Sequence, residues 1–126
     1  MLNYLDKKEP KREFTKGLNV DIFNEDKKIV SRLSAKYAIQ NVKENKVILQ
    51  DSVEVITLQN EKLQTEELIW DEKDDKVYTE KYVKMSTATE IIYGYGFNSN
   101  LDFTKWKVKD VTGTIDASDV MDGIDE

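Results

Sequence analysis

The chemistry open to this chain is that of carboxylates, lysines and tyrosines, because its 126 residues include no histidine and no cysteine. Their absence excludes most zinc, copper and haem sites. It also excludes disulfide bonds and any serine or cysteine nucleophile that a histidine activates. A catalytic or metal site in this chain would therefore have to be built mainly from acidic side chains.

Two acidic clusters are the candidates for such a site: the pair Glu66 and Glu67, and the run DEKDD at residues 71–75. A glycosidase requires a carboxyl group with a raised pKa in an apolar cleft, and nothing in the sequence places one. A calcium loop requires alternating oxygen ligands and a central glycine, but the acidic run has no glycine and is interrupted by lysine. We interpret both clusters as solvated turns and predict a protein that is not an enzyme and holds no metal or cofactor.

The segment GYGF at residues 94–97 contains two glycines in the spacing of a phosphate-binding loop. It lacks the third glycine of a dinucleotide fingerprint, and no helical pattern follows it. Glycines inside a strand pattern more often mark a bulge or the close approach of a neighbouring backbone. We therefore predict a distorted strand here and no nucleotide site.

The net charge is −6, and residues 116–126 carry −5 of it, so the first 115 residues sum to −1 (−6 minus −5). A nearly neutral body of mixed sign argues against a nucleic-acid platform, which needs a basic face. No run approaches the roughly 20 apolar residues that span a bilayer, and no signal peptide is recognisable. We predict a flexible segment over residues 1–13, one folded domain over 14–115 and an acidic, disordered tail over 116–126.

Alternation of apolar and polar residues dominates the chain from Leu18 onward and is typical of strands with one buried face. Val47, Leu49, Val53 and Val55 share one parity. Residues 29–39 are predicted as a single strand whose inward side chains are Ile29, Leu33, Ala35, Tyr37 and Ile39. Further strands are predicted in KLQTEELIW, KVYT, YVKMST, EIIYGYGF and WKVKDVTGTI, with polar turns between them. The chain is therefore predicted to be all-β.

An internal repeat organises these strands. Residues 33–55 align with residues 63–85 at a constant offset of 30, and a weaker third copy begins at Ile92. One such unit cannot bury its own apolar face, so the units are expected to stack into a continuous sheet of repeated strand pairs. Ala35, Thr65 and Gly94 occupy the same inward position, and all are small. They indicate either room for a long apolar ligand or the taper of a twisted core.

An ordered series of motifs in the second half of the chain resembles the LptC family of lipopolysaccharide-export proteins. The motifs are L-x-T-E-x-L-x-W-D (63–71), K-x-Y-T (76–79), I-x-G-x-G-F (92–97), N-x-D-F-x-x-W (100–106) and V-x-G-x-I (111–115). Upstream, residues 14–23 and 33–38 resemble the opening strands of the family. The resemblance covers residues 14–115.

The resemblance implies a twisted, antiparallel β-jellyroll that is open along one side, as in LptA-like and LptC-like domains. It implies a periplasmic domain that an N-terminal helix, absent from this sequence, anchors in the inner membrane. It also implies that the domain carries the acyl chains of lipopolysaccharide in an apolar groove. The residues expected to line this groove are Leu33, Ala35, Tyr37, Val53, Val55, Leu63, Leu68, Val83, Met85, Ile92, Gly94, Phe97 and Trp106.

The same resemblance implies partners that bind by strand addition at the two edges of the sheet. LptF-like and LptG-like transporter subunits are expected at the N-terminal edge, at Leu18, Val20 and Ile22, and an LptA-like protein at the C-terminal edge, at Val111, Gly113 and Ile115. Free edges could also pair two copies as a homodimer. The alternative function is a structural or interaction module that binds proteins through these edges and carries no lipid.

Overall fold

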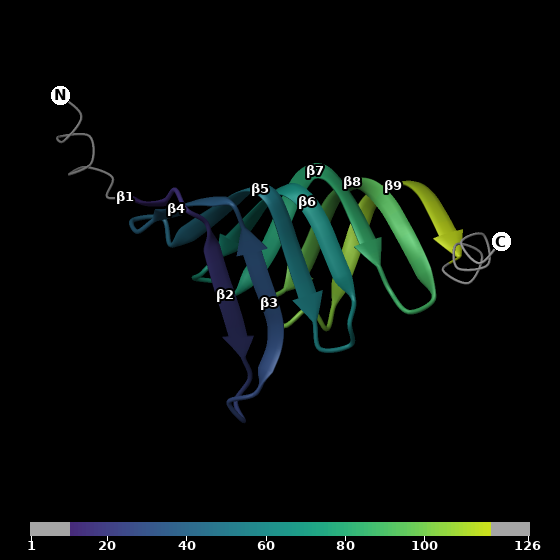
Figure 1. The fold of residues 1–126 in the computed structure, drawn as a ribbon, viewed down its shortest axis with the longest axis horizontal. Coiled ribbons are helices and arrows are strands. Elements are labelled where there is room, and N and C mark those ends of the chain that lie inside the picture. The colour runs from purple at the N-terminus through teal and green to yellow at the C-terminus, as the bar shows by residue number, and fades with distance from the viewer. Residues whose placement is uncertain (1–10, 117–126) are drawn as a thin grey trace.

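The computed structural model describes residues 11–116, and every regular element in that range is a β-strand (Figure 1). The strands are β1 (Lys11–Phe14), β2 (Leu18–Phe23), β3 (Ile29–Ala35), β4 (Tyr37–Asn41), β5 (Lys46–Thr57), β6 (Lys62–Asp71), β7 (Lys76–Ser86), β8 (Glu90–Asn100) and β9 (Trp106–Asp116). The described residues include no helix long and apolar enough to cross a membrane. The predicted tail lies, apart from Asp116, outside the described residues.

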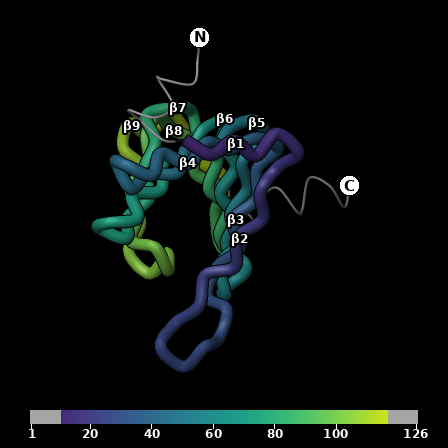
Figure 2. The backbone as a smooth tube through the Cα atoms, turned by 90° about the vertical axis from the view of Figure 1, so that its left-hand side faces the viewer, coloured from purple at the N-terminus to yellow at the C-terminus, as the bar shows by residue number. Residues whose placement is uncertain are grey.

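All strand pairs are antiparallel, and the order β1-β4-β5-β6-β7-β8-β9 runs from one end of the molecule to the other. The hairpin β2–β3 joins this sheet through β5, which pairs with β4 along its first half and with β3 along its second. The long strands are bent, so the sheet folds into two limbs that face each other (Figure 2). The all-β, open jellyroll prediction is confirmed.

We name the limbs by their residues. The first limb contains β2, β3 and residues 53–57, 62–65, 82–86, 90–94 and 111–116 of the long strands. The second limb contains β1, β4 and residues 46–50, 67–71, 76–79, 97–100 and 106–110. Each limb ends in three hairpin turns or loops, on the side opposite the bend.

The bend arises from local backbone irregularities that recur at residues 36, 51, 66, 81 and 96, a spacing of 15 (51 minus 36). Asp51 and Ser52 both adopt positive φ angles, 65° and 56°, and Gly96 has a φ of 96°. β-bulges of this kind bend a strand and strengthen its twist. Two passes through the bend make one strand pair, which explains the 30-residue offset of the sequence repeat.

The prediction of one continuous strand over residues 29–39 is wrong. The chain breaks at Lys36, between β3 and β4, where the backbone N–H of Lys36 donates a hydrogen bond to the carbonyl oxygen of Asp51 at 3.0 Å. The break inverts the inward parity, because a shift of one residue turns every side chain to the other face. Ala38 is therefore buried, whereas Tyr37 and Ile39 are only half-buried.

The N-terminal boundary also differs from the prediction. The flexible segment was expected to extend to residue 13, but residues 11–14 form β1 and pair with β4. Phe14 packs against the core at the end of this strand. Residues 1–10 of the predicted segment lie outside the described residues.

Candidate functional site

The candidate site is the interior between the two limbs. Most of the thirteen residues expected to line a groove meet there: nine apolar side chains and Gly94 are buried, and Ile92 and Trp106 pack against that cluster. The buried apolar members are Leu33, Ala35, Val53, Val55, Leu63, Leu68, Val83, Met85 and Phe97. Both limbs contribute, because Leu33 and Met85 lie on the first and Leu68 and Phe97 on the second.

Tyr37 does not belong to this interior. The strand break at Lys36 places it on the outer face of the second limb, where its hydroxyl donates a hydrogen bond to Oε2 of Glu13 at 2.8 Å. This hydrogen bond raises the pKa of the Tyr37 phenol above its ordinary value. Tyr37 therefore fastens β1 to β4 and is removed from the groove-lining set.

The row of small residues lies at the bend. Ala35 and Thr65 are each the last inward residue of the first limb before the bend, and Gly94 occupies the matching place in β8. The Thr65 hydroxyl donates a hydrogen bond to the carbonyl oxygen of Tyr82 at 2.9 Å. A Cβ atom at Gly94 would lie 2.7 Å from the carbonyl oxygen of Asp110. The limbs converge here, so the small residues reflect taper at the vertex.

An aromatic cluster fills the interior toward the C-terminal end of the sheet. The ring of Phe97 stacks on that of Phe103 at a centroid distance of 6.1 Å and on that of Trp106 at 6.2 Å. Phe103 is 1% exposed although it lies between the predicted strands EIIYGYGF and WKVKDVTGTI, where a polar turn was expected. The only signal in the sequence was an aromatic residue in a turn whose counterparts in the first two repeats have none.

The interior is closed in this structure, because the side chains expected to line a groove cover one another. Eight of them are at most 2% exposed: Leu33, Val53, Val55, Leu63, Leu68, Val83, Met85 and Phe97. Protein interiors of this kind pack at crystal-like density. A chain of ligand atoms can enter only if some part of the protein moves aside.

One polar atom in this interior has no partner. The indole Nε1 of Trp70 is buried and makes no hydrogen bond with any described residue. Trp70 packs against the core cluster and lies opposite Val47 and Val77 in the neighbouring strands. A buried N–H without an acceptor is rare and costly, so this donor marks a place where a ligand oxygen would be stabilised.

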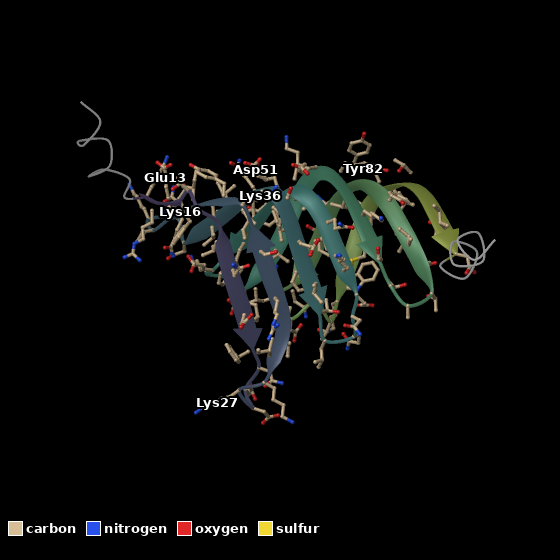
Figure 3. The ribbon with its side chains drawn as sticks, in the orientation of Figure 1. Glu13, Lys16, Lys27, Lys36, Asp51 and Tyr82 are labelled. Carbon is tan, nitrogen blue, oxygen red and sulfur yellow. The ribbon has the colours of Figure 1, made fainter. Side chains whose placement is uncertain are left out.

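The acidic clusters lie outside this interior. Glu66 is exposed at the bend, and Glu67 accepts a hydrogen bond from Nε2 of Gln50 at 3.1 Å. Asp71 accepts hydrogen bonds from the backbone of Lys73 and Asp74, which fixes the turn after β6. Within residues 11–116 no group of acidic side chains is placed to hold a metal ion. Figure 3 shows Lys36, Asp51 and Tyr82 along the outer ridge of the bend.

The residues expected to bind partners lie in edge strands. Within residues 11–116, β2 pairs with β3 alone and β9 pairs with β8 alone, so these two strands form outer edges at opposite ends of the sheet. On β9, Val111 and Ile115 are 53% and 40% exposed, and Gly113 is half-buried. On β2, Ile22 is buried and Leu18 and Val20 pack against the core. These edges could each accept a further strand.

Comparisons with known proteins agree with the motifs. A family model described as "Lipopolysaccharide-assembly, LptC-related" matches residues 6–116, nearly the whole chain. A search of curated proteins finds no match. The matched range contains every strand from β1 to β9 and all of the candidate groove and edge residues.

Proposed function

The chain belongs to the LptC-related family of lipopolysaccharide-assembly proteins, and we propose that it carries lipopolysaccharide by holding the acyl chains between its two limbs. Because the LptC-related family is a family of transport proteins, the chain has a role in lipopolysaccharide transport. In this proposal the domain does no chemistry on its cargo. It supplies an apolar path, and the energy for movement comes from a partner.

The observation that carries the proposal is an unbroken row of apolar side chains along the inside of the first limb. In the register of the sheet the row is Leu33, Val55, Leu63, Met85 and Ile92, each opposite the next. Neighbouring strands lie about 4.8 Å apart, so the four steps of the row span about 19 Å. The row runs across the strands, from the N-terminal toward the C-terminal edge of the sheet, which is the direction of handover.

The two edges would connect the path to its partners. We propose that the transporter subunits, similar to LptF and LptG, add a strand at β2 and that an LptA-like protein adds one at β9. The positions of β2 and β9 as edge strands at opposite ends of the sheet, among residues 11–116, support this arrangement. The domain would then work in the periplasm beside the inner membrane, between the transporter and the bridge.

A binding measurement with purified protein tests the proposal. Met85→Gln places a polar amide in the buried row, whereas Lys84→Gln changes the adjacent, outward residue. We expect the first variant to lose most of its affinity for fluorescent lipopolysaccharide and the second to bind as the wild type does, with circular dichroism showing both folded. Equal binding by both variants would contradict a path through the interior.

Trp70 supplies a separate prediction about how the cargo is held. Acyl chains of lipopolysaccharide are joined through ester and amide carbonyls, which are acceptors for the unpartnered indole N–H. In a Trp106→Phe variant, Trp70 is the only indole left, since the chain has two tryptophans. Lipopolysaccharide should move its ¹H–¹⁵N resonance downfield, and an alkyl detergent without a carbonyl should not. The same shift from both would show that Trp70 senses burial alone.

A further inference from the structure

The β8–β9 turn, residues 101–105, differs from its two counterparts at the free end of the second limb, which are residues 42–45 and 72–75. Each turn contains one residue in the left-handed region: Asn45 at φ 57°, Asp75 at 52° and Phe103 at 60°. Asn and Asp tolerate this conformation, whereas a bulky residue there is an outlier. Asn45 and Asp75 are exposed, and Phe103 is buried. Phe103 is therefore an unusual residue for this position of the turn, and its side chain packs in the interior against Phe97.

The turn also reaches across the opening between the limbs. The Ser31 hydroxyl, on β3 of the first limb, donates a hydrogen bond to the carbonyl oxygen of Leu101 at 3.4 Å. The Leu101 N–H donates to the carbonyl oxygen of Asp75 in the neighbouring turn at 3.1 Å. Within residues 11–116, the hydrogen bond from Ser31 is the one side-chain hydrogen bond that joins a strand of one limb to a turn of the other. The turn thus closes the interior beside the aromatic cluster.

We propose that the space filled by the Phe103 side chain is a binding site for an apolar chain. The 101–105 turn moves away from this site when such a chain binds. The inference rests on the proposed function and adds a position and a moving part to it. The bound chain would lie beside the ring of Phe97, in the place of the ring of Phe103.

Of the segments that close the interior, this turn can move with the smallest loss of hydrogen bonds and buried contacts. Leu33, Val55 and Met85 are held in strands paired on both sides, so moving them breaks several ladder hydrogen bonds. Phe103 is held by its own burial and by two hydrogen bonds of Leu101: one to Asp75 at 3.1 Å, and one from Ser31 at 3.4 Å, which is longer than the usual O–H···O distance. The left-handed conformation of Phe103 opposes these contacts and favours its release. An apolar chain in the same binding site would bury apolar surface in place of the Phe103 ring.

A distance measurement across the opening tests this. The chain has no cysteine, so spin labels attach only at introduced sites: Arg32→Cys beside Ser31 and Thr104→Cys in the turn, both of which are exposed. We expect the distance between labels, measured by double electron–electron resonance, to lengthen when lipopolysaccharide binds. A control pair, Lys43→Cys with Lys73→Cys, lies on the two neighbouring turns and should not change.

The outcomes separate the two proposals. An unchanged distance in protein that co-elutes with lipopolysaccharide would overturn the moving turn and leave the transport function standing. Protein that does not co-elute with lipopolysaccharide at all would count against the transport function. In that case Phe103→Ala still tests the binding site, because an emptied apolar cavity binds apolar molecules. Parinaric acid should then bind several-fold more tightly to the Phe103→Ala variant than to the control Phe23→Ala. Equal affinity for the two variants would overturn the proposed binding site.

Discussion

Replacing Phe97 by alanine should lower the free energy of unfolding by about 3–5 kcal/mol, the range measured for buried aromatic residues. The side chain is 0% exposed and stacks against the rings of both Phe103 and Trp106. Its loss would leave a cavity that the strand ladders of β7 and β9 on either side prevent from collapsing. The midpoint of urea unfolding, followed by circular dichroism, measures the effect.

Tyr95→Ala is the matched control for this prediction. Tyr95 lies two residues away on β8, is 53% exposed, and contacts the ring of Tyr82 at a centroid distance of 5.0 Å. We expect a cost of about 0.5–1.5 kcal/mol, the usual contribution of an aromatic pair. Similar losses in the two variants would mean that the aromatic cluster does not pack the interior.

Replacing Gly94 by valine should destabilise the protein by ~1–3 kcal/mol or more, through crowding at the bend. A Cβ at this position would lie 2.6 Å from Cγ1 of Val108 and 2.7 Å from the carbonyl oxygen of Asp110. The second contact is with backbone, so β9 must shift away from β8. We expect a lower unfolding midpoint and faster amide exchange in residues 106–111.

Gly113→Val provides the comparison for Gly94→Val. Gly113 also lies in the β8–β9 pair, opposite Tyr93, but a Cβ there meets no atom within 4 Å. Valine suits an extended strand better than glycine, so stability should be kept or slightly increased. If both valines destabilise equally, loss of glycine itself is responsible and the close approach of β9 is not.

The strands could be predicted from the sequence because their period of two persists across each bend. Val47, Leu49, Val53 and Val55 keep one parity although Asp51 and Ser52 lie between them in left-handed conformations. The turns lie where polar segments separate the predicted strands, but the last of them contains the buried Phe103, which its polar neighbours did not predict. The face on which Tyr37 lies was not predictable in this way. Strand β3 ends before Lys36, and this single residue between β3 and β4 reverses the alternation. The backbone hydrogen bond that fixes the break joins Lys36 to Asp51, which is 15 residues away (51 minus 36).

The site was predictable in part. Inward residues were identified from alternation, since burial on one face of a strand follows from its period. Two features depend on contacts between limbs, which no local pattern records. Phe103 is inward because its turn folds over the opening toward Ser31, and the small residues at Ala35, Thr65 and Gly94 lie at a vertex that exists only once the sheet is bent.

The central claim is that lipopolysaccharide passes between the limbs, and site-specific photo-crosslinking in cells tests it most directly. Benzoylphenylalanine at Met85 and Phe97 faces the interior, and at the adjacent positions Lys84 and Asn98 it faces outward. Lipopolysaccharide adducts should form from the two inward positions and not from their neighbours, in variants that fold as the wild type does. Adducts that form equally from Lys84 and Asn98, or protein adducts alone, would contradict the claim.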